Sequence, residues 1–199
     1  MSLLFETIAC IDGRLQNLEW HQARLNRSYK ALFGNPSNIL LKDILTLPDQ
    51  AQSGLWKCRV TYDTLLRKVE FEPYIRTKIN TLKLVNSDLS YAYKFEDRKA
   101  IHTLFQQRGE ADDIVIVKDG FITDSSKANI LLFDGENWYT PDKPLLPGTM
   151  RAYLLDESKI KAKPILKSDL AFYHKIMLIS AFSPFDESRA LALPQAISS

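Results

Sequence analysis

The stretch Asp119–Phe133, which reads DGFITDSSKANILLF, says more about the fold class than any other part of the sequence. Asp-Gly is a preferred hairpin turn, and residues that favour strands follow at 121–124 and again at 129–133. Together with a strand expected at 113–118, the stretch predicts a run of short strands joined by tight turns. Asp124 follows a hairpin and precedes two serines, where a turn residue would make local hydrogen bonds to the backbone.

Short strands and helices alternate along the rest of the chain. Strands are expected near 4–11, 56–63, 69–71, 81–85, 137–140, 163–166 and 176–181, and helices near 18–32, 39–47, 94–108 and 149–157. Many of the joins are hairpins, so we expect an α+β fold of two mixed α/β lobes rather than a doubly wound parallel sheet. Pro73–Asn80 is the best linker candidate, which predicts lobes at 1–80 and 81–199, with Lys94 in the second.

The composition argues against several classes of protein. Hydrophobic residues make up 45% and charged residues 25% of the 199 residues, which is ordinary for a globular chain. A net charge of +2 without a Lys/Arg cluster argues against nucleic-acid binding, and no apolar run approaches the ~18 residues that span a membrane. Met1–Glu6 lacks the basic region of a signal peptide, so we expect a cytoplasmic protein in which Cys10 and Cys58 are reduced.

Metal and nucleotide sites of the common kinds are not expected either. The histidines, His21, His102 and His174, are scattered, and the seven glycines form neither a P-loop nor a Rossmann motif. His21 lies three residues after Leu18 and four before Leu25, which places it on the apolar face of its helix. A satisfied core histidine is therefore the favoured interpretation of His21.

Lys94 is the most informative candidate for chemistry. Within the expected helix it is spaced with Arg98, Ile101 and Phe105 so as to lie on the inward stripe. Burial lowers the pKa of an amine, which prepares it to attack an aldehyde and to carry protons afterwards. The alternative is a lysine that reaches from the first helical turn to water.

Arg59 lies on the polar face of the strand expected at 56–63. If that face lines a cleft, the guanidinium is suited to binding a phosphate. If the face is exposed to solvent, Arg59 and Asp63 are a surface pair that contributes little. The strand pattern leaves both interpretations open.

Three further groups are candidates for a ligand site. Asp124 could sit against a cationic ring nitrogen and keep it protonated. Gly148-Thr149 opens a helix after a proline, where unpaired N–H groups attract an anion, unless the segment is only a turn with a threonine cap. Ser180 ends the last strand, and its hydroxyl could reach a phosphate. An amine, an acid and a helix start are three groups that a pyridoxal phosphate site needs.

Taken in order, several segments resemble the class IV aminotransferases, the fold type IV pyridoxal phosphate enzymes. The matching segments are FETI at 5–8 with DGR at 12–14, HQARL at 21–25, Gly120–Ile130, Thr140-Pro141 and Leu146–Arg151. The similarity covers roughly residues 4–186. The family includes branched-chain and D-amino acid aminotransferases and 4-amino-4-deoxychorismate lyase.

The resemblance implies a cofactor, a fold and a set of roles. Carried over position by position, it implies that Lys94 forms the Schiff base and that Asp124 contacts the pyridine nitrogen of the cofactor. The phosphate contacts would come from Arg59, Gly148, Thr149 and Ser180. The cofactor would lie between two α/β domains of a D-amino acid aminotransferase-like fold, in a homodimer that acts on a small amino-acid-like substrate. Asp124 replaces the usual glutamate, and the chain starts within the first motif, so we expect an N-terminally truncated member.

The resemblance leaves the reaction open. Arg98, four residues after Lys94, resembles the Lys-x-x-Asn-Arg pattern of the deoxychorismate lyases, with Asp97 in place of the Asn. The branched-chain enzymes instead carry a tyrosine five residues after the lysine, where this chain has Lys99. The favoured activity is therefore 4-amino-4-deoxychorismate lyase, which eliminates pyruvate and gives 4-aminobenzoate. A class IV aminotransferase is the first alternative, and a cofactor-binding or structural homologue without turnover is the second.

Overall fold

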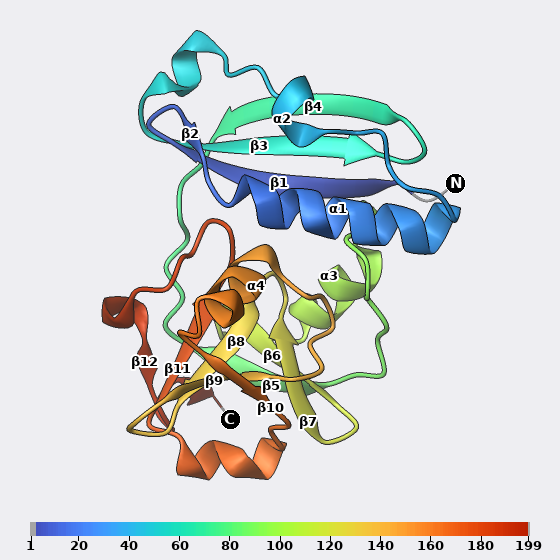
Figure 1. Cartoon of the computed structure of the whole chain (residues 1–199). Helices are drawn as coiled ribbons and strands as arrows, with labels where there is room; N and C mark the ends of the chain where they lie inside the picture. The colour runs from blue at the N-terminus through green and yellow to red at the C-terminus, as the bar shows by residue number, and fades with distance from the viewer. Residues whose placement is uncertain (1–2, 199) are drawn as a thin grey trace. The chain divides into compact units, whose positions relative to one another are not determined.

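A computed structural model describes residues 3–198, and Figure 1 labels its elements. The chain forms two compact units. Unit 1 contains the described residues up to Arg76 and the later segment Tyr93–Asp97, and unit 2 contains Thr77–Ala92 and the described residues from Arg98 onward. The sequence predicted a single division at residue 80, whereas the chain here returns once to unit 1 before it continues in unit 2.

Unit 1 is built on an antiparallel sheet with the strand order β2-β1-β3-β4. Its elements are β1 (Leu4–Ile11), β2 (Arg14–Leu15), α1 (Leu18–Phe33), α2 (Leu41–Ile44), the 3-10 turn η1 (Asp49–Gln52), β3 (Leu55–Tyr62) and β4 (Leu66–Pro73). Cys58, Val60 and Tyr62 of β3 alternate along the strand and are buried in one core with Leu25 of α1 and Leu41 of α2.

The ends of α1 follow the sequence signals in part. Asp12-Gly13, whose residue types favour a hairpin turn, forms one before it, with φ angles of 46° and 74°. Gly34 ends the helix in the left-handed conformation, which glycine adopts without strain. Asn17 precedes the helix and is of a residue type that often caps one, but its side chain makes no capping bond, because its own backbone is left-handed rather than extended.

Unit 2 is built on a mixed sheet with the order β10-β9-β8-β7-β6-β5-β13, to which β11 is added beside β8 and β12 beside β11. Its strands are β5 (Leu82–Asn86), β6 (Asp113–Lys118), β7 (Phe121–Ser125), β8 (Asn129–Phe133), β9 (Trp138–Pro141), β10 (Lys161–Lys163), β11 (Lys175–Ile179), β12 (Leu191–Ala192) and β13 (Ile197–Ser198). Parallel pairs (β5–β6, β9–β10, β5–β13) are mixed with antiparallel ones. This pattern confirms the predicted α+β class over a doubly wound sheet.

The helices of unit 2 are short. They are α3 (Lys99–Gln106), α4 (Thr149–Asp156) and the 3-10 turns η2 (Lys167–Phe172) and η3 (Glu187–Arg189). The prediction of α4 is confirmed to within one residue. The predicted helix over 94–108 is wrong at its start, because α3 begins only at Lys99, and the strand predicted near 163–166 is wrong in position, because β10 ends at Lys163.

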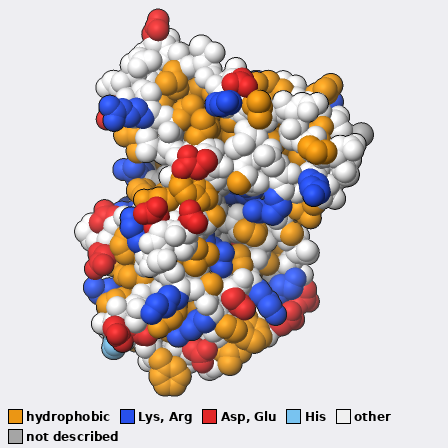
Figure 2. Space-filling view, in the orientation of Figure 1, with side chains coloured by type: hydrophobic (Ala, Val, Ile, Leu, Met, Phe, Trp, Pro, Cys, Tyr) orange, Lys and Arg blue, Asp and Glu red, His pale blue; other side chains and the backbone are white. Residues whose placement is uncertain are grey.

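Charged side chains of both signs are interspersed on the face drawn in Figure 2, with no broad area of one sign. This distribution agrees with the small formal net charge of +2. None of the helices found in residues 3–198 is both long enough and apolar enough to cross a membrane.

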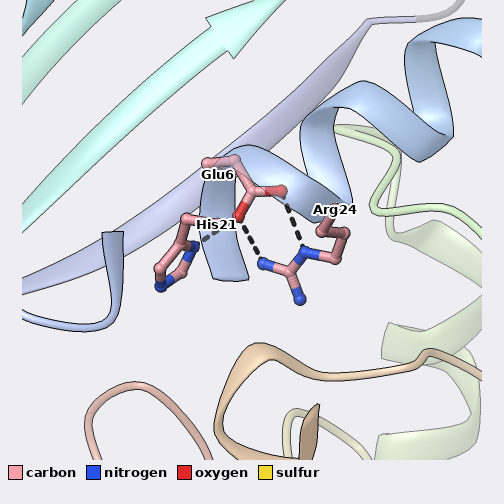
Figure 3. Close-up of polar contacts among 3 residues, drawn as sticks. All are labelled: Glu6, His21 and Arg24. Carbon is pink, nitrogen blue, oxygen red and sulfur yellow. Dashed lines mark hydrogen bonds and ion pairs between the residues drawn. The ribbon is translucent and has the colours of Figure 1, made fainter. Parts of the chain in front are cut away.

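A buried carboxylate connects β1 to α1 in unit 1 (Figure 3). Glu6 accepts hydrogen bonds from Nδ1 of His21 at 2.6 Å and from Nε and Nη2 of Arg24 at 2.9 and 2.5 Å. All three side chains are buried. The interpretation of His21 as a satisfied core histidine is confirmed.

The partners of Glu6 determine its protonation state. Burial by itself would raise the pKa of Glu6, but the charge of Arg24 and the hydrogen bonds from His21 and Arg24 lower it from 4.5 to about 2. A pKa lowered by this amount corresponds to about 3 kcal/mol of stability at neutral pH, which is lost as the pH falls from 4.5 toward 2. Burial lowers the pKa of His21 from 6.5, so stability also declines as the pH falls below that value.

We expect Glu6→Gln to lower the free energy of unfolding by about 3 kcal/mol at pH 7, because it leaves the guanidinium of Arg24 buried without its counter-charge. Urea denaturation followed by circular dichroism measures the loss. Glu70→Gln is the matched control, because Glu70 pairs with Lys68 at the surface, where an ion pair contributes about 0–1 kcal/mol. Equal losses in the two variants would contradict a structural role for the buried network.

Candidate functional site

Lys94 lies in an extended segment of unit 1. Its carbonyl accepts the N–H of Phe5 at 3.0 Å, the neighbouring Phe95 forms a bridge with Leu4, and Glu96 N–H donates to the carbonyl of Leu3. The backbone groups of Lys94 and Glu96 are therefore bonded to Phe5 of β1 and to Leu3, which precedes β1. The predicted helix does not include these residues for that reason. Tyr93 and Phe95 also pack on the core of unit 1, so Lys94 belongs to this unit rather than to the second lobe in which the sequence placed it.

The ring of Phe5 brings two of the predicted site residues together. Nζ of Lys94 lies 4.6 Å and Cζ of Arg59 lies 4.0 Å from the centroid of this ring. Phe5 itself is 2% exposed, so the ring is a fixed surface for both cations. Cation–π contacts of this kind contribute about 0.5–2 kcal/mol each and restrict where the amine of Lys94 can point.

Arg59 has a carboxylate partner that the sequence analysis did not consider. Its Nη2 donates to Oε1 of Glu96 at 3.1 Å, and both side chains remain partly exposed. The alternative pairing with Asp63 is wrong, because Asp63 accepts two hydrogen bonds from Arg67. Arg59 therefore lies on the same face as Lys94, with part of its donor capacity taken by Glu96.

Asp124 is a buried acid of unit 2 with two fixed donors. Oδ1 accepts the side-chain amide of Asn129 at 2.7 Å, and Oδ2 accepts the backbone N–H of Leu146 at 2.8 Å. The interpretation of Asp124 as a residue bonded to the backbone of the following serines is wrong, because these donors come from β8 and from the segment before α4. β7 and β8 are paired at Asp124 and Asn129, which places the two side chains next to each other.

Burial dominates the electrostatics of Asp124. It raises the pKa of the carboxyl group from 3.8 to about 7, although the donors Leu146 and Asn129 and the charge of Arg151 act in the opposite direction. Arg151 is itself buried and donates to Thr140 Oγ1 and to the carbonyl of Pro141. An acid of this kind changes its charge near neutral pH, and a cation placed beside it would favour the ionised form.

The start of α4 lies beside this acid. Gly148 is the N-cap residue and has no side chain with which to cap the helix, and the first turn contains no acidic residue. A Cβ atom at Gly148 would lie 2.0 Å from Oδ1 of Asn129, so only glycine allows this approach. A helix N-terminus without an acidic side chain in its first turn is suited to binding an anion.

Ser180 is held by contacts within its own turn. It forms a tight turn with Ser183, and its hydroxyl accepts a hydrogen bond from the N–H of Phe182 at 3.3 Å.

The loop after Asp124 is held by a contact with Arg98. The carbonyl of Ser126 accepts a hydrogen bond from Nη2 of Arg98 at 2.6 Å. In the part of the chain that is described, no three or more His, Cys, Asp and Glu side chains gather to hold a metal ion.

The structure thus groups the predicted residues within each unit. Lys94 and Arg59 meet at Phe5, whereas Asp124 and Gly148 meet through Asn129. The sequence analysis gave no role to Asn129, although a lone polar residue at the head of the apolar strand NILLF was a usable signal.

We expect Asp124 to titrate near pH 7 in the protein without ligand, because burial disfavours its ionised form. Carbon-13 NMR of the carboxyl carbons measures the titration, and the spectrum of Asp124→Asn assigns the resonance. Asp134 is the internal control, since hydrogen bonds from Asn137 and Glu136 at the surface lower its pKa from 3.8. An Asp124 that titrates together with Asp134 would contradict its burial.

Comparison with known proteins identifies the family. Residues 3–185 match the family described as Amino-transferase class IV. A Haemophilus influenzae protein, named only as uncharacterized, is 37% identical over 183 residues, which cover 90% of this chain and 97% of that protein.

Solved structures show the same relationship. The crystal structure of a candidate 4-amino-4-deoxychorismate lyase from Haemophilus somnus 129PT shares 34% identity, with a TM-score of 0.88 over 93% of this chain and 98% of its own. A hypothetical aminotransferase of Mycobacterium tuberculosis in its pyridoxal phosphate-bound form is 18% identical and has the same fold, with a TM-score of 0.79 over 99% of this chain and 81% of its own. Because the family match spans nearly all of the described residues, the chain belongs to the class IV aminotransferases.

Proposed function

We propose that this protein is a pyridoxal phosphate-dependent enzyme that acts on an amino-acid-like substrate. The observation that carries the proposal is the buried Asp124, which lies beside the N-terminus of α4 and has a pKa near neutrality. An acid for a ring nitrogen and N–H groups for a phosphate are what this cofactor requires, and Lys94 adds the amine. The donor set therefore fits the cofactor.

Each residue has a separate task in the proposed reaction. Lys94 attaches the cofactor covalently, and the contacts with the Phe5 ring hold its amine in one place. Asp124 holds the proton on the ring nitrogen, Gly148 and Thr149 offer backbone N–H groups to the phosphate, and Ser180 adds a hydroxyl. When bound, the cofactor supplies an electron-withdrawing ring that stabilises negative charge on the substrate carbon bearing the amino group.

Two arginines of unit 1 are candidates for the phosphate. Arg59 shares the Phe5 ring with Lys94, but Glu96 already accepts one of its N–H groups. Arg24 is buried and oriented by Glu6, and the charges of Arg24 and Lys94 both add to the effect of burial in lowering the pKa of His21. We propose Arg59 as the phosphate ligand, with Arg24 as the alternative.

The activity that we favour is 4-amino-4-deoxychorismate lyase. It is supported by Arg98, four residues after Lys94, and by the 34% identity with a protein named as a candidate for this activity. Lys94 would take the proton from the carbon that bears the amino group and return a proton to the departing pyruvate. In an aminotransferase, the first alternative, the same lysine would move that proton onto the cofactor. The second alternative is a homologue without turnover.

We expect added pyridoxal phosphate to change its visible absorption when it is mixed with the protein, and Lys94→Ala to abolish the change, because the amine is its point of attachment. Borohydride reduction followed by peptide mass spectrometry would locate the bond on Lys94. Lys68→Ala, at the surface of unit 1, is the matched control.

The same titration distinguishes the two arginines. Loss of affinity for pyridoxal phosphate, but not for pyridoxal, in Arg59→Ala would support Arg59, and the same result in Arg24→Lys would support Arg24. Attachment of the cofactor to a lysine other than Lys94 would contradict the proposed site.

The lyase is expected to convert aminodeoxychorismate to equal amounts of 4-aminobenzoate and pyruvate without a 2-oxo acid, because elimination needs no amino acceptor. Chromatography of 4-aminobenzoate and an enzymatic assay of pyruvate measure the products. Turnover of an amino acid that depends on a 2-oxo acid would favour the aminotransferase. Covalent attachment without either reaction would favour the homologue without turnover.

A further inference from the structure

Asn129 contacts every part of the candidate site in unit 2. It is the first residue of β8, it is 5% exposed, and its amide Nδ2 donates to Oδ1 of Asp124 at 2.7 Å and to the carbonyl of Leu146 at 2.9 Å. Its Oδ1 faces the backbone of Gly148, where a Cβ atom would lie only 2.0 Å away. The side chain of Asn129 thus connects Asp124 to the segment Leu146–Gly148, which precedes α4.

The bonds around Asn129 form a closed ring. Asn129 donates to Asp124 and to the carbonyl of Leu146, and the N–H of Leu146 donates back to Oδ2 of Asp124 at 2.8 Å. Because the N–H and the carbonyl of Leu146 are both bonded, neither of the two peptide groups that flank this residue can rotate without breaking a hydrogen bond. The segment that leads into α4 is therefore tied to the carboxyl group of Asp124.

We propose that Asn129 is a positioning residue that fixes the carboxyl group of Asp124 and the N-terminus of α4 relative to each other. In the proposed function, on which this role rests, these are the groups for the ring nitrogen and the phosphate of one cofactor. The short phosphate arm of that cofactor limits the distance between the two groups to a narrow range, so a fixed separation in the protein lowers the loss of conformational entropy on binding.

Asparagine and glycine are both required by this arrangement. The amide of Asn129 supplies two N–H donors to two acceptors, which neither leucine nor aspartate provides. Gly148 allows the backbone to approach that amide, and its backbone angles of φ −73° and ψ 152° are open to any residue. The need for glycine at 148 is therefore one of space, and it originates in the side chain of Asn129.

The first test follows Asp124 by carbon-13 NMR in the protein without cofactor. Asn129→Ala removes a donor that favours the ionised carboxylate, so the pKa of Asp124 is expected to rise. Gly148→Ala is expected to raise it as well, because the added methyl group displaces the amide of Asn129. In the Asn129→Ala background Gly148→Ala is expected to have no further effect, since the obstructing amide is gone.

The second test measures cofactor binding with the same variants. Asn129→Ala is expected to weaken binding of pyridoxal phosphate about tenfold or more, the size expected for one hydrogen bond to a charged group. Binding of pyridoxal, which lacks the phosphate, should be weakened less, because only the contact with Asp124 is then affected. Asn137→Ala is the matched control, since this side chain accepts a hydrogen bond from Lys161 Nζ near the surface.

The outcomes separate this proposal from the function on which it rests. An unchanged titration of Asp124 in both single variants, or additive effects in the double variant, would overturn the role of Asn129 while cofactor binding stands. Failure of the unsubstituted protein to bind pyridoxal phosphate would overturn the proposed function and this role with it. If Asn129→Ala does not fold, Gly148→Ala still decides, because the clash that it creates is with the side chain of Asn129.

Discussion

Burying a carboxylate requires partners, and the arrangement of both units depends on how this requirement is met. Glu6 in unit 1 is matched by the charge of Arg24 and by His21, so that its pKa falls to about 2. Asp124 in unit 2 has neutral donors, Asn129 and Leu146, and only the more distant charge of Arg151, so that burial prevails and its pKa rises to about 7. The first acid is a permanent anion that ties a helix to a strand, whereas the second can change its charge.

Apart from Arg24, the alternative candidate for the phosphate, the same contrast separates structural from candidate functional residues. In the Glu6 network charge and hydrogen bonds are matched inside the unit. Around Asp124 the acid is held in position by the neutral donors Asn129 and Leu146, and the first turn of the adjoining helix contains no acidic residue. Near Lys94 two cations share one aromatic ring. Incomplete compensation of this kind is typical of sites that bind a charged ligand.

Local patterns predicted much of the fold but not the position of Lys94. Hairpin turns such as Asp12-Gly13 and strands with strict alternation were predictable, because their signals lie within a few residues. The helix spacing around Lys94 was equally clear, yet the segment pairs with β1 because its N–H and carbonyl groups meet Leu3 and Phe5. A contact between residues about ninety positions apart overrides a local preference that is worth only tenths of a kcal/mol per residue.

By itself, the sequence determined the α+β class, the order of most of the elements, the buried His21 and the family, because each follows from periodicity, turn chemistry or motifs in order. Only the tertiary structure decided that Lys94 joins unit 1, that Glu96 pairs with Arg59, and that Asn129 links Asp124 to Gly148. These are contacts between segments that are distant in the chain. The physical reason is that a side chain acquires its partners, its burial and its pKa from the packing of whole elements, and no local pattern contains that information.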